Sequence, residues 1–149
     1  MSATTGNTTP IFIGAANLTP VRINAANNNP DLSSTASIFQ LVSAGVDGTR
    51  VDGVRFRNAQ NIAASASSAM LHRIYLYNGS GLTNSNFRLI GEVATAAATR
   101  SNGVTVGATS IFTFDQPLIM GAGQSLYVSQ SVYIGQQDQF DAMAFAGNY

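Results

Sequence analysis

The chain carries one histidine, His72, which is the first candidate for acid–base chemistry. Polarity alternates around it, so His72 would share a strand face with Ile74 and Leu76. A histidine base needs an activated nucleophile. The stretch around Ser125 reads Gly-Gln-Ser-Leu-Tyr, which lacks the final glycine of the Gly-x-Ser-x-Gly turn of serine hydrolases. We therefore predict that His72 is a packed residue and that the protein is not an enzyme, with a hydrolase as the third functional hypothesis.

Two pairs of aspartates could serve acid–base catalysis or bind a hard cation: Asp47 with Asp52, and Asp138 with Asp141. Neither pair has the dense Asp/Asn/Gly spacing of a calcium-binding loop. The chain has no cysteine, which excludes disulfides and thiolate metal sites. Because aspartates at such positions commonly cap turns or face solvent, we predict no catalytic site, no metal and no cofactor.

The charges are few and balanced, which limits the kinds of partner. Seven arginines stand against six aspartates and one glutamate, lysine is absent, and the net charge is zero. Ser, Thr, Asn and Gln supply 49 of the 149 residues, so we expect a largely neutral polar surface. Without a basic field we predict no nucleic-acid partner. Because no apolar stretch approaches the roughly 18 residues that span a bilayer, we predict no membrane partner.

Two of the arginines, Arg55 and Arg57, fall on one face of a predicted strand, opposite Val54 and Phe56. We expect them to pair with acids on a neighbouring strand or on a partner subunit. Cross-strand ion pairs contribute only about 0.2 to 1 kcal/mol, so they would set register and specificity more than affinity. Both are therefore candidate interface residues.

The elements that would position these residues are β-strands. Val, Ile, Thr, Phe and Tyr are abundant, and glycine and proline are spread along the chain as turn signals. This pattern predicts an all-β fold, an antiparallel β-sandwich of jelly-roll type with about eight strands, over residues 31–149. The expected strands cover residues 38–42, 51–57, 71–77, 87–93, 111–114, 117–120, 126–133 and 140–145.

The first thirty residues contain a ten-residue repeat, in which Asn-x-x-Pro recurs and ends at Pro10, Pro20 and Pro30. Proline favours strand starts and sheet edges. Residues 1–30 are therefore predicted to form an N-terminal arm that adds strands to a neighbouring subunit, or the first edge strands of the sandwich itself. The candidate contact residues of this segment are Ile11, Phe12, Ile13, Val21 and Ile23.

Several longer segments follow one another in a familiar order. They are GTRVDGVRFRNAQN, LHRIYLYNG, FRLIGEVATAAATRSN, FTFDQPLIMGAGQSLYVSQS and FDAMAFAGNY. In this order the chain resembles the capsid decoration, or cement, proteins of tailed bacteriophages, which have jelly-roll folds. The resemblance covers roughly residues 36–149 and leaves the N-terminal repeat outside it.

The resemblance implies a viral structural protein that decorates and stabilises a phage capsid by bridging neighbouring coat subunits. Its partners would be the major capsid protein and further copies of itself, as a homodimer or homotrimer. It would be made in the host cytoplasm and reside on the outer surface of the virion capsid.

The alternative is a tail or fibre module that binds host glycans, because jelly rolls also occur in lectins. Its aromatic platform would come from the tyrosines, since tryptophan is absent. The candidates are Tyr75, Tyr77, Tyr127, Tyr133 and Tyr149.

Overall fold

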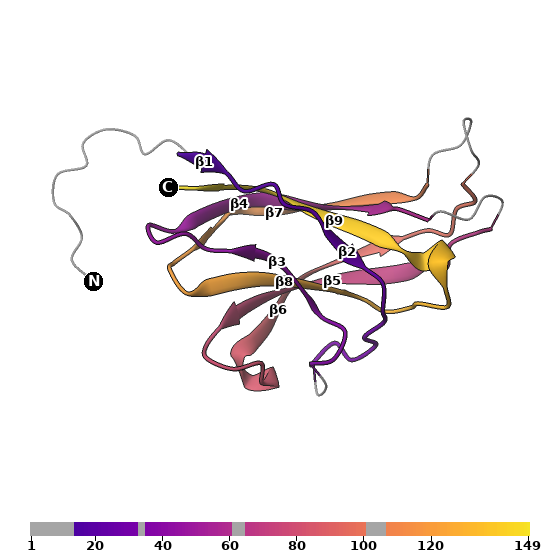
Figure 1. Cartoon of the computed structure of the whole chain (residues 1–149), viewed down its shortest axis with the longest axis horizontal. Coiled ribbons are helices and arrows are strands. Elements are labelled where there is room, and N and C mark those ends of the chain that lie inside the picture. The colour runs from indigo at the N-terminus through magenta and orange to yellow at the C-terminus, as the bar shows by residue number, and fades with distance from the viewer. Residues whose placement is uncertain (1–13, 33–34, 61–64, 101–106) are drawn as a thin grey trace, which may run out of the picture.

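The computed structural model of the chain is a sandwich of two antiparallel β-sheets, and it describes residues 14–32, 35–60, 65–100 and 107–149 (Figure 1). Sheet A contains β1 (Ala15–Ala16), β2 (Val21–Ile23), β9 (Phe140–Asn148), β4 (Thr49–Asn58) and β7 (Thr109–Met120). Sheet B contains β3 (Phe39–Ser43), β8 (Gln124–Gln130), β5 (Met70–Asn78) and β6 (Phe87–Thr95). The described helices are two short 3-10 turns, η1 (Asn84–Asn86) and η2 (Gln136–Asp138). Neither has the length or apolar character that crossing a bilayer requires.

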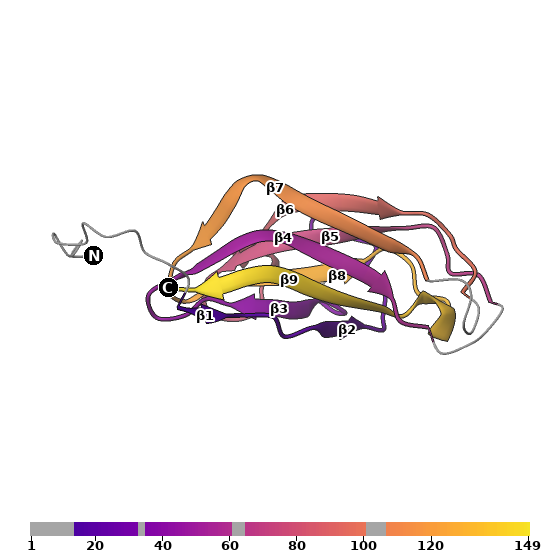
Figure 2. The same ribbon diagram turned by 90° about the horizontal axis from the view of Figure 1, so that it is seen from above.

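The order of strand pairing defines a jelly roll. Strands β1 and β2 pair with the last strand, β9, while β3 pairs with β8, β4 with β7, and β5 with β6. The chain is therefore a long hairpin rolled into two facing sheets, and Figure 2 shows β7, β4 and β9 running side by side in sheet A. The predicted all-β antiparallel sandwich is confirmed. The described residues form nine strands, where about eight were expected over residues 31–149. Two of the nine, β1 and β2, precede that range and both lie along the same edge of β9.

The core lies between the two sheets and follows the period-two pattern of the sequence. In β4, Val54 and Phe56 are fully buried while Arg57 is exposed. In β9, Ala142 and Ala144 point inward and alternate with Asp141 and Met143. The inward residues of both sheets form one apolar cluster, whose fully buried members include Ile23, Val51, Val54, Phe56, Ile74, Met120, Leu126, Val128 and Phe140.

The segments predicted as separate strands over 111–114 and 117–120 belong to one strand, β7. Its pairing with β4 is irregular, because Val51 lies opposite Leu118 whereas Gly53 lies opposite Thr113. The bulge falls on an edge strand, where Pro117 disrupts no interior ladder. A proline that reads as a break in the sequence is therefore accommodated within a single strand.

The N-terminal segment contributes an edge of sheet A. Val21 and Ile23 pair with Ala142 and Phe140 of β9 and face the core of their own chain. Ile23 is completely buried, so its side chain has no surface to offer a partner subunit. A division at residue 30 therefore falls after a strand of the sandwich. Ile11, Phe12 and Ile13 lie outside the described residues.

The connection between β2 and β3 covers part of the outer face of sheet B. Leu32 is buried there against Tyr75 and Phe87, in a second, smaller apolar cluster. The backbone of Asn27 donates to the carbonyl of Gln130 at 2.9 Å and accepts from Arg73 Nη1 at 3.2 Å. These contacts fasten the connection to the sheet, so part of the outer face of sheet B is occupied by the chain itself, while Leu71 and Leu89 stay exposed.

We predict that Gly53→Ala destabilises the protein by about 1–3 kcal/mol, the usual cost of overpacking. A Cβ at Gly53 would lie 2.5 Å from the backbone oxygen of Phe112, and a backbone atom in a sheet cannot move aside easily. Gly121→Ala is the matched control, because its Cβ would approach no atom closer than 3.9 Å. Chemical denaturation of both variants measures the difference, and equal stabilities would contradict the close approach of β4 and β7.

Candidate functional site

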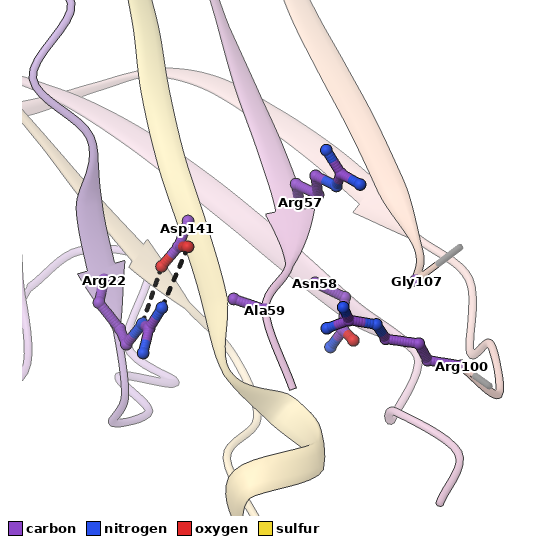
Figure 3. A pocket seen from close by; sticks show the side chains of 7 residues that line it. All are labelled: Arg22, Arg57, Asn58, Ala59, Arg100, Gly107 and Asp141. Atoms are coloured by element: carbon purple, nitrogen blue, oxygen red, sulfur yellow. Dashed lines mark hydrogen bonds and ion pairs between the residues drawn. The ribbon is translucent and has the colours of Figure 1, made fainter. Parts of the chain in front are cut away.

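A pocket of about 310 Å³ lies where β4 ends and β9 begins, on the outer side of sheet A. Its lining combines three arginines and one aspartate with an asparagine and two small residues (Figure 3). The side chains come from β2, β4, β9 and the connection between β6 and β7. The lining residues are Arg22, Arg57, Asn58, Ala59, Arg100, Gly107 and Asp141.

One side of the pocket is an ion pair across two neighbouring strands. Arg22 of β2 lies directly opposite Asp141 of β9, which places both side chains on the same face of the sheet. The guanidinium of Arg22 donates from Nε to Oδ1 at 2.8 Å and from Nη2 to Oδ2 at 3.2 Å. The hydrogen bond and the charge of Asp141 raise the pKa of Arg22. This pair is bidentate, which fixes the position of the carboxylate.

Arg57 lies on the other side of the same carboxylate. It pairs in register with Asp141 across β4 and β9, but Asp141 bonds to Arg22 instead. In the described part of the chain, Arg57 forms no ion pair and no hydrogen bond. Arg100 enters from the opposite side and donates from Nη1 to the carbonyl of Gln60 at 2.6 Å (Figure 3). Three guanidinium groups therefore share the pocket with one carboxylate.

Asn58 lines the same pocket and is almost fully buried. Its Nδ2 donates to the carbonyls of Gln137 at 2.8 Å and Gln139 at 3.2 Å, which fixes the amide. Its Oδ1 accepts no hydrogen bond from any residue that the structure describes. A Cβ at Gly107 would lie 2.9 Å from this oxygen, so the backbone at this position packs closely on the Asn58 side chain.

The pocket therefore offers donors and acceptors of different kinds to a small polar ligand. The guanidinium groups provide planar, permanently charged donors that suit oxyanions. The Asp141 carboxylate and the Asn58 amide oxygen provide acceptors that suit hydroxyl groups. The sequence indicated Arg57 but not Arg22, Arg100 or Asn58. The alternation of residues 21–23 could have placed Arg22 on the outer face, but nothing local brings Arg100 to it.

A second feature is the open face of sheet A, by which we mean the outward side chains of β4, β7 and β9. Cross-strand register brings Arg55 between Met143 of β9 and Ile111 of β7. Ile111 is 54% exposed, and two more large apolar side chains on this face, Ile119 and Phe145, are 58% and 36% exposed. In contrast to the outer face of sheet B, no connection in the described chain covers these residues.

The predicted interface arginines both lie on this open face. Arg55 is half-buried, Arg57 is exposed, and neither forms an ion pair within the described residues. The expected pairing with acids of a neighbouring strand is therefore not found for either. Three other arginines do pair with acids: Arg22 with Asp141, Arg50 with Asp52, and Arg73 with Glu92.

The tyrosines proposed as a sugar platform do not form one. Tyr75 is buried under the connection between β2 and β3. Tyr77 and Tyr127 are half-buried and pack against each other and against Phe87, with ring centroids 5.0 to 5.6 Å apart. Tyr133 and Tyr149 are half-buried as well. A platform that includes Tyr75, Tyr77 and Tyr127 is thus corrected by the structure, because these three rings serve packing instead.

His72 is part of the core. Its ring stacks on Phe56 at a centroid distance of 4.3 Å and contacts Phe140 at 4.6 Å. Burial lowers the pKa of His72 to about 3, so the ring is neutral at physiological pH. Ser125 lies opposite Tyr77 whereas His72 lies opposite Gln130, which places them at opposite ends of β5 and β8. They form no catalytic pair.

Of the four aspartates singled out in the sequence, Asp52, Asp138 and Asp141 have hydrogen-bond partners in the described chain. Asp138 is fully buried and accepts from the backbone amides of Ser68 at 2.7 Å and Ile134 at 2.8 Å. Asp52 accepts from Arg50, and Asp47 is exposed in the turn between β3 and β4. Among the described residues, no three His, Asp or Glu side chains converge in a way that could hold a metal ion.

Comparisons with known proteins add little to this picture. No protein-family model matches the chain, and no curated protein sequence matches it. Among solved structures, the chain is similar to the family 32 carbohydrate-binding module of NanJ from C. perfringens in complex with galactose. The two are 11% identical, with a TM-score of 0.39 over 87% of this chain and 98% of the other. A likeness at this level carries no argument about ligand, so the jelly-roll assignment rests on the strand pairing of this chain.

We predict that His72 makes the protein sensitive to acid. The unfolded state binds a proton at a pKa near 6.5 and the folded state only near 3. The stability that depends on a neutral ring is therefore complete above pH 6.5 and is lost as the pH falls toward 3, by about 1.4 kcal/mol per pH unit. Between pH 7 and pH 4, the unfolding free energy of His72→Leu should fall by about 3 kcal/mol less than that of the wild type.

All other ionisable groups are the same in both proteins, so the difference between the two pH profiles isolates the histidine. Urea denaturation at several pH values measures it. Parallel profiles would show that folding does not change the pKa of His72 and would contradict the prediction.

Proposed function

We propose that this protein is a non-catalytic binding module whose ligand is a glycan, as in a tail or fibre module that contacts a host surface. The observation that carries the proposal is the concave pocket at the end of sheet A, where charged and amide groups converge from four segments of the chain. Binding sites for small polar ligands are typically concave and have a few well-placed polar groups. The pocket volume of about 310 Å³ is at the lower end of the range for such sites.

The positions of the other candidate catalytic residues favour binding over catalysis. The histidine is stacked in the core, Ser125 has no histidine partner, and the buried carboxylate of Asp138 is saturated by structural hydrogen bonds. Sugar hydroxyls match the acceptors of the pocket, namely Asp141 and Asn58. Since the tyrosines do not provide a stacking platform, recognition in this proposal depends on hydrogen bonds and charge.

We predict that Ala59→Tyr abolishes glycan binding, because a large ring at this half-buried lining position would fill the pocket. The matched control is Ala122→Tyr, which adds the same ring in the exposed turn between β7 and β8. Wild type and both variants would be applied to an array of bacterial surface glycans. The proposal expects binding by the wild type and the control only. An array on which the wild type binds no glycan would contradict it.

A second candidate function is the decoration of a phage capsid, and the open face of sheet A favours it. Met, Arg and aromatic side chains are enriched at protein interfaces, and this face combines Met143, Phe145, Arg55 and Ile111. In this proposal the open face contacts the major capsid protein. The chain would be made in the host cytoplasm and would lie on the outer surface of the virion as a homodimer or homotrimer. Contacts to several subunits at once would raise retention through effective concentration.

For this second candidate we predict that Ile111→Asp prevents binding to empty phage shells without unfolding the protein. A charge at this exposed position on the open face would have to be desolvated on contact. Val46→Asp is the control, since Val46 is 89% exposed in the turn between β3 and β4, away from this face. Co-sedimentation with undecorated shells measures binding, and equal retention of both variants would exclude this face as the contact.

A further inference from the structure

We propose that the pocket selects acidic sugars, in which a carboxylate binds between the guanidinium groups of Arg57 and Arg100 while ring hydroxyls donate to Asp141 and Asn58. This inference rests on the proposed glycan-binding function and specifies its ligand class.

The first argument is the charge of the pocket in a protein that otherwise has little charge. Three of the seven arginines line this one pocket, and the single carboxylate among them is already held by Arg22 at 2.8 Å. Like charges in proximity repel each other, more strongly where solvent is partly excluded. An anion between Arg57 and Arg100 would relieve this repulsion.

The second argument is the state of each guanidinium. Arg22 is committed to Asp141 by two hydrogen bonds, and Arg100 is anchored by one Nη to the carbonyl of Gln60. Arg57 forms no hydrogen bond or ion pair with the described chain, although it lies directly opposite Asp141 across β4 and β9. Arg57 is thus available to form the paired hydrogen bonds with a carboxylate that its planar fork favours.

The third argument is the presence of acceptors in the same pocket. Asn58 is 3% exposed, its Nδ2 is held by two carbonyls, and its Oδ1 lacks a donor within the described residues. A buried acceptor without a donor is costly, and a ligand hydroxyl would satisfy it. The free lone pairs of Asp141 serve the same chemistry. Acceptors beside cations match a ligand with both hydroxyls and a carboxylate, whereas a polyphosphate chain has no hydroxyl to offer and would be repelled by Asp141.

The size of the pocket also favours a compact anion over a polymer. No lysine is present, and among the arginines outside the pocket Arg50 and Arg73 are paired with acids. Three of the seven basic groups line the pocket, and the acid-paired arginines outside it do not extend it into the stripe that a nucleic acid requires. A single acidic sugar residue, or the acidic end of a longer glycan, fits this arrangement.

The test compares two sugars that differ only in the carboxylate. Methyl β-glucuronide and methyl β-glucoside would be titrated into the 15N-labelled full chain at constant ionic strength, with acetate as a third ligand. We expect the glucuronide to shift the Arg57 and Arg100 side-chain resonances and to bind at least about tenfold more tightly than either the glucoside or acetate. In Arg57→Gln this affinity should fall by about tenfold or more, whereas Arg88→Gln, an exposed arginine on β6, should bind as the wild type does.

The outcomes separate the inference from the function on which it rests. Equal binding of glucuronide and glucoside at the pocket would overturn the acidic selectivity and leave glycan binding intact. Acetate binding as tightly as glucuronide would show a site for carboxylates in general and overturn the role of the hydroxyls. If neither sugar binds, and no acidic or neutral glycan on the array does, both the inference and the glycan-binding function fail.

Discussion

The structure depends on the pairing of the last strand, β9, with β2 on one side and β4 on the other. This pairing joins the two ends of the chain and closes the roll, because every other strand pair is nested inside it. It also creates the candidate site. Asp141 lies at the beginning of β9, so closure brings it between Arg22 and Arg57, which are 35 residues apart in the sequence.

The outer faces of sheet A and sheet B differ in how far the chain itself covers them. The face of sheet B is partly covered by the connection between β2 and β3, whose Leu32 packs among aromatic side chains. The face of sheet A has no such cover in the described chain and exposes both large apolar side chains and arginines. Both functions proposed above use sheet A: its open face for a protein partner, and the pocket at its end for a small ligand.

Because the chain has few charged residues, the role of each one can be considered separately. Arg73 and Glu92 join β5 to β6, and Asp138 fixes Ser68 and Ile134 through backbone and hydroxyl hydrogen bonds. These groups serve the fold. Other charged side chains, such as those of Arg88 and Asp115, lie elsewhere on the surface, but the pocket brings three arginines and one aspartate together.

The sequence by itself determined the fold class and the inward and outward sides of most strands, because alternation of polarity is a local property. Val54 and Phe56 inside with Arg55 and Arg57 outside is one example. It also determined that His72 packs between strands, since its neighbours on that face are apolar. Only the tertiary structure decided that Tyr75 is covered, that Ile23 belongs to the core of its own chain, and that Arg100 lines the same pocket as Arg22. These features depend on which strands, distant in the sequence, pair with one another and on where the connections cross the sheets. Both are fixed only when the whole jelly roll closes.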